Sequence, residues 1–252
     1  MTRIVADLGN SRLKWARVAP GGRLGAAVAL PANDPEAWAS AWEAWGLAGG
    51  GESAWAIASV NPPMAERLAR FLEAQGAGEV RWFRSAAAVT DRHELEGAET
   101  GGADRALAVL GALARRGGRG PGLVVSCGTA VTVERIAADG TWQGGAIAPG
   151  LGPMANALHL MTAQLPRVIP SEAPPAFGRG TVPSLEAGVF WGMVGAIREL
   201  LARQSVGLEP PPWVVWTGGD APSFAPWVEW PGAEVVPDLV LEGLAGLAWA
   251  RP

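Results

Sequence analysis

The chain opens on apolar and polar positions whose pattern predicts two short strands joined by a tight turn. Residues 4–6 are apolar, residues 7–11 hold turn-forming side chains, and residues 13–18 alternate in character again. Glycine and asparagine in the turn favour the positive φ angles that a hairpin needs. The same pattern returns later, with apolar residues 123–125, a glycine-containing turn and an extended segment at 130–134. Two such units about 120 residues apart predict a duplicated fold.

Apolar residues repeated every three or four positions predict several helices. The clearest spans residues 104–116, because it begins at an acidic residue and ends in two arginines followed by two glycines. Both features match the preferences of helix ends. The same reasoning predicts further strands over residues 54–60, 80–83, 141–147 and 213–216, and further helices over residues 62–72, 153–164, 181–204 and 237–249.

Composition and charge exclude several classes of protein. A hydrophobic content of 49% in 252 residues is ample for a buried core, and a net charge of −4 gives no basic surface for nucleic acid. The acidic residue Asp7 lies where a signal peptide would have its basic or apolar segment, so we expect no signal peptide. Apolar runs such as 106–114 are too short to span a membrane. Cys127 is the only cysteine, so no intrachain disulfide can form. We expect a cytoplasmic protein.

Lys14 is the only lysine among 20 lysine and arginine residues. Lysine carries a compact charge on a flexible stem, which suits contact with a single phosphate oxygen. A compositional bias toward arginine could also have left this one lysine by chance.

The turn before Lys14 has the composition of a phosphate-binding turn. Gly9 lets backbone amides approach phosphate oxygens, and successive amides in a turn form an anion-binding nest. Asp7 at a strand end could hold Mg²⁺, which prefers a few carboxylates together with phosphates. An ordinary hairpin with asparagine and serine in its turn explains the same residues.

Two later turns repeat this composition. Gly128 and Thr129 combine glycine with a hydroxyl between two apolar strands, and could hold a phosphate from another side. Gly218 and Gly219 follow an apolar strand and would let the backbone pack flat against a planar ring such as adenine. Each turn could equally be a plain connection between elements.

The start of the helix at residue 104 carries a further candidate site in the run Gly102-Ala103-Asp104-Arg105. Asp104 could serve as a general base, with Arg105 binding an anionic group of the substrate in bidentate fashion. An acidic residue in a first helical turn also complements the helix dipole, by about 0.3–1 kcal/mol.

Taken in order along the chain, these motifs resemble the type III pantothenate kinases, also called the Bvg accessory factor-like family. Further matches lie at 144–150, Thr181, 217–219 and 239–244. The family belongs to the actin-like ATPase and sugar-kinase superfamily. The resemblance implies an α/β fold of two similar ribonuclease H-like (actin-like ATPase) domains, each a mixed sheet flanked by helices, with a cleft between them. We place these domains at residues 1–117 and 118–252.

The resemblance also implies the reaction, ATP-dependent phosphorylation of pantothenate to 4'-phosphopantothenate, the first step of coenzyme A biosynthesis. Asp104 would be the general base, and Asp7 would organise magnesium. The substrate would be bound by Gly102, Ala103, Asp104, Arg105 and Thr181. ATP would be bound by Asp7, Leu8, Gly9, Asn10, Ser11, Arg12, Leu13, Lys14, Gly128, Thr129, Gly218 and Gly219.

Two positions depart from the family pattern. Ser126 stands where the family usually has an aspartate that binds a monovalent cation, potassium or ammonium. A hydroxyl is a weaker cation ligand, so we expect weakened or absent potassium dependence. Leu95 stands where the family often has a tyrosine that contacts the substrate.

Three functions are compatible with these residues. The first is an active pantothenate kinase, and the second is a nucleotide-binding regulatory homologue with reduced or no kinase activity. The third is a kinase for another small hydroxyl substrate. The resemblance further implies a homodimer. The apolar helix over residues 181–204 is compatible with the interface, although burial in the core would explain its composition as well.

Overall fold

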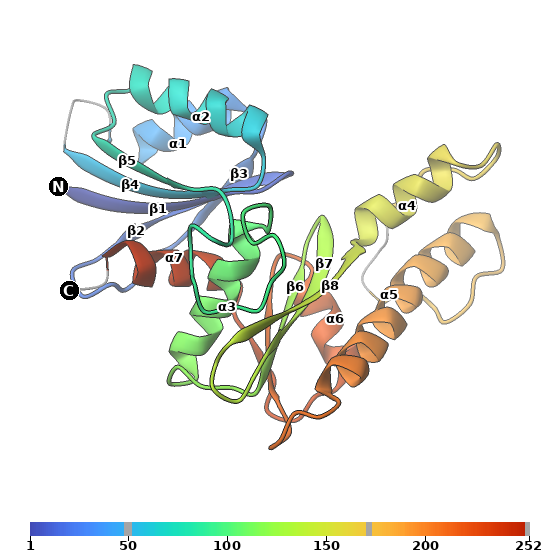
Figure 1. The fold of residues 1–252 in the computed structure, drawn as a ribbon. Helices are drawn as coiled ribbons and strands as arrows, with labels where there is room; N and C mark the ends of the chain where they lie inside the picture. The colour runs from blue at the N-terminus through green and yellow to red at the C-terminus, as the bar shows by residue number, and fades with distance from the viewer. Residues whose placement is uncertain (48–51, 170–172, 250–252) are drawn as a thin grey trace. The chain divides into compact units, whose positions relative to one another are not determined.

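A computed structural model describes residues 1–47, 52–169 and 173–249 and divides the chain into two compact units (Figure 1). The first unit comprises residues 1–115 together with residues from 238 onward, and the second comprises residues 116–237. The division at residue 115 lies close to the expected boundary at 117. The C-terminal helix differs from the expectation, because it belongs to the first unit rather than the second.

The first unit is built on a five-stranded mixed sheet with the strand order β3-β2-β1-β4-β5. The central strand β1 pairs antiparallel with β2 and parallel with β4. The strands are β1 (Thr2–Leu8), β2 (Arg12–Val18), β3 (Val28–Pro31), β4 (Ser53–Ser59) and β5 (Glu79–Phe83), and the helices are α1 (Pro35–Ala44), α2 (Pro62–Ala74), α3 (Ala103–Arg115) and α7 (Leu239–Trp249).

The second unit repeats this arrangement. Its sheet has the order β10-β9-β6-β7-β8, in which β6 pairs antiparallel with β7 and parallel with β9. The predicted duplication is thus confirmed strand by strand. The strands are β6 (Gly122–Cys127), β7 (Ala130–Ile136), β8 (Trp142–Pro149), β9 (Trp213–Thr217) and β10 (Glu234–Val235), and the helices are α4 (Leu151–Leu160), α5 (Thr181–Ser205) and α6 (Ala221–Val228).

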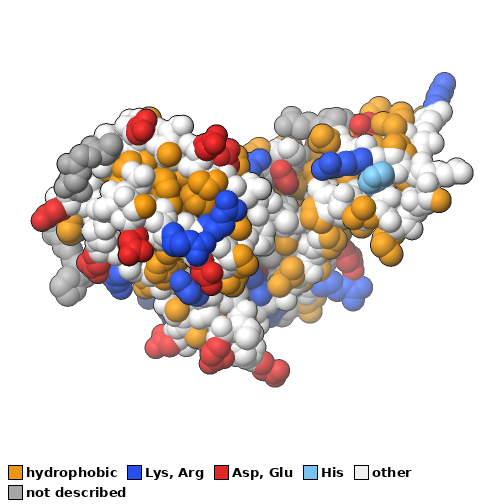
Figure 2. Space-filling view, turned by 90° about the horizontal axis from the view of Figure 1, so that it is seen from above, with side chains coloured by type: hydrophobic (Ala, Val, Ile, Leu, Met, Phe, Trp, Pro, Cys, Tyr) orange, Lys and Arg blue, Asp and Glu red, His pale blue; other side chains and the backbone are white. Residues whose placement is uncertain are grey.

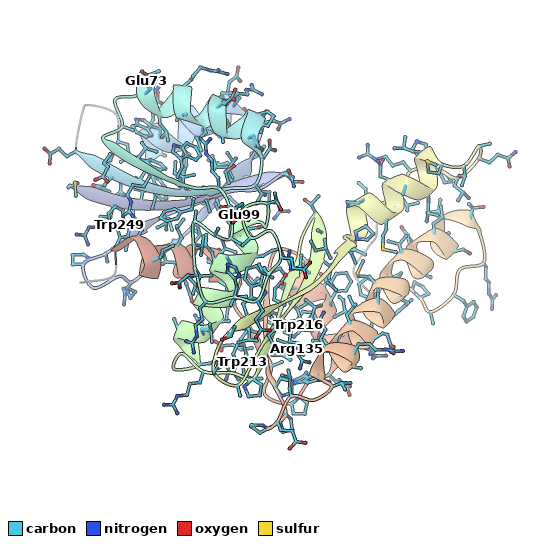
Figure 3. The ribbon with its side chains drawn as sticks, viewed as in Figure 1. Glu73, Glu99, Arg135, Trp213, Trp216 and Trp249 are labelled. Atoms are coloured by element: carbon cyan, nitrogen blue, oxygen red, sulfur yellow. The ribbon has the colours of Figure 1, made fainter. Side chains whose placement is uncertain are left out.

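One face of each sheet packs into an apolar core. In the first unit, Trp42 of α1 stacks on Trp55 of β4 with ring centroids 5.8 Å apart, and Trp15 meets Trp55 edge-on. Side chains of α2 complete this core. In the second unit, Trp216 of β9 (Figure 3) packs with Phe190 of α5 and with α6. Large aromatic side chains therefore supply much of the buried area of both cores.

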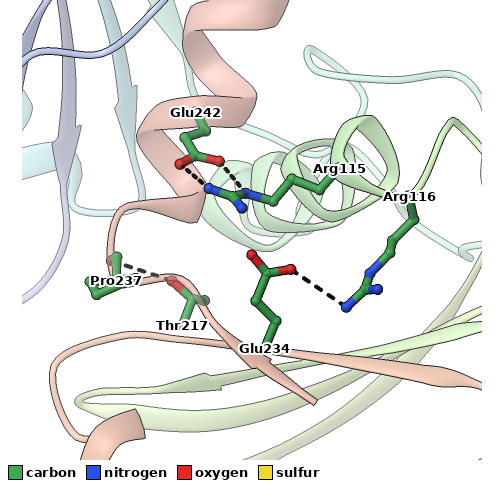
Figure 4. A network of polar contacts seen from close by, with 6 residues as sticks. All are labelled: Arg115, Arg116, Thr217, Glu234, Pro237 and Glu242. Atoms are coloured by element: carbon green, nitrogen blue, oxygen red, sulfur yellow. Dashed lines mark hydrogen bonds and ion pairs between the residues drawn. The ribbon is translucent and has the colours of Figure 1, made fainter. Parts of the chain in front are cut away.

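The other face of the first sheet is covered by α7. This helix packs against β1, β2 and β4, and at its end the Arg3 guanidinium lies 5.2 Å from the ring centroid of Trp249 (Figure 3). It also crosses α3 closely, because a Cβ atom added at Gly243 would lie 2.1 Å from the Leu107 carbonyl oxygen. Arg115 of α3 and Glu242 of α7 form a bidentate ion pair at 2.6 and 2.7 Å (Figure 4). These contacts explain why α7 belongs to the first unit.

A candidate kinase active site

The first phosphate-binding candidate is the hairpin between β1 and β2. The backbone N–H of Gly9 donates to the Arg12 carbonyl oxygen at 3.0 Å and closes the turn, while Asn10 and Ser11 are exposed. Leu8 and Leu13 bury their side chains in the apolar core, so this part of the predicted ATP-binding run has only its backbone available for a ligand.

Strand alternation directs the charged residues of this hairpin to the opposite face of the sheet from the core. Ile4, Ala6 and Leu8 belong to the core on the α1 and α2 side, so Asp7 between them points to the side covered by α7. Lys14 is the register partner of Asp7 in the antiparallel pair and therefore shares that side. Both residues are half-buried.

Asp104 lies in the first turn of α3, as the sequence predicts. Its Oδ1 accepts a hydrogen bond from the Arg105 backbone N–H at 2.9 Å. A Cβ atom at Gly102 would lie 2.4 Å from the same oxygen and 3.5 Å from a methyl group of Val60, the residue after β4. The glycine therefore lets the helix start close beside the end of β4 with the carboxylate in place.

The electrostatics of Asp7 show that the two motifs of the first unit converge. Burial raises the pKa of Asp7 to about 7, the negative charge of Asp104 contributes to the increase, and the charge of Lys14 acts in the opposite direction. Residues from a hairpin and from a distant helix thus form one charged site. Without a cation or ligand, the site therefore favours the protonated form of Asp7 far more than water does.

Lys14 has a partner that sequence reasoning did not identify. Its Nζ lies 3.3 Å from Oδ1 of Asp238, the residue that immediately precedes α7. The two residues are separated by 224 positions, and no local pattern connects them. An acidic residue directly before an apolar helical run is a known signal for the start of a helix. This signal could single out Asp238, but not its contact with Lys14.

Magnesium fits the acidic side of this site. Within the ranges that the structure describes, no group of three or more His, Cys, Asp or Glu residues could hold a metal. Mg²⁺ in kinases is usually held by one or two carboxylates together with substrate phosphates and water, so a larger protein cage is unnecessary. The negative charges of Asp7 and Asp104 repel one another, and a cation bound beside them would reduce that repulsion.

The second unit brings three glycine-containing segments together. At Gly150, a Cβ atom would lie 2.0 Å from the Gly128 carbonyl oxygen, and the Gly150 N–H donates to Thr129 at 2.9 Å. At Gly218, which has a φ of +93°, a Cβ atom would lie 2.1 Å from the Cys127 carbonyl oxygen. The turn at 128–129 is therefore packed against both other segments, and only glycine permits these approaches.

Ser126 lies in a row of hydroxyl side chains across the second sheet. It pairs in register with Thr132 on β7 and with Thr217 on β9, so the three side chains share one face. Thr132 is buried, and its Oγ1 has no hydrogen-bond partner. Glu134, two positions further along β7, accepts a hydrogen bond from the Trp142 indole N–H at 3.0 Å. The row itself therefore offers neutral oxygens rather than a carboxylate.

The remaining candidates lie on other elements of the two units. Thr181 is the first residue of α5 and is exposed, while Arg105 is half-buried in the first turn of α3. Leu95 donates its backbone N–H to Nδ1 of His93 at 3.1 Å. Burial, followed by the charge of Asp220, raises the pKa of the Cys127 thiol, which agrees with the interpretation of this residue as packed rather than nucleophilic.

Known proteins resemble this chain over nearly its whole length. A family model described as type III pantothenate kinase matches residues 3–203. A type III pantothenate kinase from Acidiphilium cryptum is 31% identical over 99% of this chain and 95% of that protein. Another from Thiobacillus denitrificans is 36% identical over 98% of this chain and 97% of that protein.

A solved structure shows the same fold. It is a Baf family protein from Campylobacter jejuni, described as a conserved transcriptional activator. The TM-score is 0.60 at 20% identity, over 97% of this chain and 96% of the other. None of the helices in the described part of this chain is long and apolar enough to cross a membrane. With a family model and two nearly full-length relatives in agreement, the chain belongs to the type III pantothenate kinase family.

Proposed function

We propose that this protein transfers the γ-phosphoryl group of ATP to the primary hydroxyl group of pantothenate, the first step of coenzyme A biosynthesis. Membership of the kinase family supports this proposal. The observation that carries it is the convergence of Asp7, Lys14 and Asp104 on one side of the first unit. Ser126 and Leu95 were the reasons to consider a regulatory homologue without kinase activity, and the comparisons with known proteins give that alternative no support.

Asp104 is the general base in this proposal. It accepts the proton of the pantothenate hydroxyl group as that oxygen forms its bond to the γ-phosphorus, and the bond from the γ-phosphorus to the bridging oxygen of ADP breaks. The backbone of Gly102 and Ala103, with the guanidinium of Arg105, binds the substrate, and Thr181 adds a further contact. The helix dipole favours the ionised form of a carboxylate in the first turn of α3, and the ionised form is the one that can accept a proton.

The ATP contacts in the proposal are those that the family resemblance implies. Asn10, Ser11, Lys14 and Thr129 contact the phosphates, and Gly218 with Gly219 packs against the adenine ring. Asp7 holds magnesium, which neutralises charge on the phosphates. Phosphoryl transfer depends mainly on alignment and charge neutralisation, and these residues supply both.

The proposal is tested by measuring ADP release from ATP with and without pantothenate, with the product identified by mass spectrometry. We expect ADP release that depends on pantothenate and matches the formation of 4'-phosphopantothenate. Nucleotide binding without either product would instead identify the regulatory homologue. Turnover with another alcohol, but not with pantothenate, would identify the third function.

Potassium should have little effect on this enzyme. The hydroxyl row of Ser126, Thr132 and Thr217 lacks the carboxylate that binds a monovalent cation strongly. We expect turnover in sodium or Tris buffer to be within about twofold of that in potassium, and Ser126→Asp to introduce potassium activation. Strong potassium activation of the unmodified protein would contradict this expectation. Val125→Ile, a change at a neighbouring position of β6 on the apolar side, serves as the control.

We also propose that the protein is a homodimer, as the family resemblance implies. Support comes from α4 and its surroundings, where Ala155 is the one buried residue of the helix and Leu160, Met161 and Phe177 are 68%, 84% and 70% exposed. Figure 2 shows hydrophobic side chains exposed on the part of the molecule that carries α4. Exposed apolar side chains of this extent often mark protein–protein contacts.

The dimer can be tested with charge substitutions on this surface. We expect Leu160→Glu combined with Met161→Glu to give a monomer in sedimentation velocity, because association would bury the introduced charges. Val206→Glu, at an equally exposed apolar position beyond α5, is the control and should remain dimeric. A monomeric unmodified protein at micromolar concentration would exclude the dimer.

A further inference from the structure

The ion pair between Lys14 and Asp238 joins a predicted phosphate-binding residue to the start of α7, a helix that contributes none of the predicted site residues. The distance from Nζ to Oδ1 is 3.3 Å, and the two side chains are 21% and 38% exposed. A lysine ammonium at the end of four methylene groups has many accessible positions and loses substantial side-chain entropy when one is fixed. A fixed partner that restricts it in advance reduces this loss on ligand binding.

Asp7 and Asp238 together limit where the ammonium can lie. The strand register places Lys14 opposite Asp7, on the α7 side of the sheet, and the Lys14 charge acts directly on Asp7. Asp238 then holds the ammonium from the start of α7. With Asp7 alone, the ammonium would be drawn to the carboxylate assigned to magnesium. Asp238 supplies a second attraction that keeps Lys14 available for a phosphate.

Asp238 is itself well fixed. Its carbonyl oxygen accepts the Glu242 backbone N–H at 3.0 Å, which begins α7. The preceding carbonyl oxygen, of Pro237, accepts a hydrogen bond from the Thr217 hydroxyl group at 3.4 Å (Figure 4). The close approach of Gly243 to Leu107 holds the following turn of α7. A carboxylate at a helix N-terminus is also favoured by the helix dipole.

We propose that Asp238 is a positioning residue, which holds the Lys14 ammonium in the orientation that contacts a phosphate of the nucleotide. The proposal rests on the kinase function proposed above and extends its site to the first residue before α7. Asp238 acts through Lys14 and touches neither the substrate nor the transferred group.

Asp238→Asn is the decisive variant, because it preserves shape and removes the charge. Glu242→Gln is the matched control. Glu242 lies in α7, one turn after Asp238, and the change removes its ion pair with Arg115 of α3. We expect Asp238→Asn to lower kcat about 10-fold with a smaller change in KM for ATP, since misplacement of a positioning group acts on the transition state. Glu242→Gln should stay within twofold. Equal losses in both variants, or an unchanged kcat in Asp238→Asn, would refute the proposal.

A spectroscopic measurement separates positioning from a structural role. Since Lys14 is the only lysine, protein labelled with ¹³C-lysine gives one Cε signal, which reports on this side chain alone. We expect faster sub-nanosecond motion at Cε in Asp238→Asn and no change in Glu242→Gln, at equal Tm. An unaffected Lys14 signal in Asp238→Asn would overturn the proposal.

The two proposals fail in different ways. If the unmodified protein shows no turnover with pantothenate, the proposed reaction is wrong, while the NMR comparison still decides whether Asp238 restrains Lys14. In Lys14→Met protein, Asp238→Asn should cause no further loss of kcat, because its effect passes through the ammonium. A full additional 10-fold loss would show that Asp238 acts by another route.

Discussion

Replacing Asp104 by asparagine is expected to lower kcat by about 10²–10⁴-fold, the usual contribution of a general base. Asparagine has nearly the same shape, and its Oδ1 can still accept the Arg105 backbone N–H. It cannot take up the proton of the pantothenate hydroxyl group. KM for ATP should change little, because the proposed ATP contacts come from other residues.

Pantothenate-dependent ADP release measured at saturating substrates tests this prediction. Asp34→Asn is a suitable control, since Asp34 caps α1 through the backbone N–H groups of Glu36 and Ala37 and asparagine caps helices equally well. The control should retain full activity. A kcat of Asp104→Asn within a few-fold of the unmodified protein would remove Asp104 from the role of base, as long as both proteins unfold at the same temperature.

Replacing Asp7 by asparagine is expected to abolish most activity and, in the absence of magnesium, to stabilise the folded protein at alkaline pH. Burial and Asp104 raise the pKa of Asp7 from 3.8 to about 7. Between these values the folded state holds a proton that the unfolded state has released, so the free energy of unfolding falls as pH rises and levels off above about 7. Asparagine removes this penalty without removing the side chain.

The stabilisation should therefore depend on pH. At about pH 8.5 in EDTA, we expect Asp7→Asn to be more stable by about 2–4 kcal/mol, and near pH 4 we expect little difference, since a pKa unit corresponds to about 1.4 kcal/mol. Denaturant unfolding across this range measures the difference. Asp34→Asn should show no such trend. A gain that is independent of pH would mean that Asp7 does not carry the raised pKa.

Magnesium provides a second test of Asp7. A cation bound beside Asp7 and Asp104 favours the ionised carboxylates, so added Mg²⁺ should stabilise the unmodified protein at alkaline pH. The same addition should have a smaller effect on Asp7→Asn. Equal stabilisation of both proteins would place the metal elsewhere.

Local patterns in the sequence were sufficient to predict the strands next to each glycine turn. The apolar residues 4–6 and the alternating residues 13–18 lie within β1 and β2, and residues 123–125 and 130–134 lie within β6 and β7. The predicted duplication follows from this repetition and is seen in both sheets. Patterns of this kind are reliable where one face of a strand is buried and the turn demands glycine.

Elements with weaker local signals were not predicted. β10 has only two residues, and α6 contains Pro226 and lacks a side-chain cap. β3 is a short, partly exposed strand. Helix α1 was not predicted either, although the sequence carries a signal for it, because Asp34 is a favourable N-cap and Pro35 a favourable first residue. The predicted helix at 153–164 ends at Leu160, where the Thr162 hydroxyl group donates to the Leu158 carbonyl oxygen.

The site was predictable only as far as its residues lie in motifs. Asp7, Lys14 and Asp104 come from such motifs, and the structure brings them together. The partnership of Lys14 with Asp238 arises from the packing of α7 on the first sheet, and that packing depends on a glycine contact with α3. A contact that two distant residues make through helix packing produces no hydrophobic pattern in the sequence around either of them.

The interrupted first unit has a consequence for biosynthesis. Domains generally form in the order in which they leave the ribosome. Here β1 to β5 emerge early, yet the helix that covers their open face, α7, is translated only after the entire second unit. Until α7 is synthesised, the face of the first sheet that it covers therefore stays exposed, and protection by a chaperone would matter most during that interval. A chain that ends before residue 238 would contain the whole second unit, but its first unit would lack α7.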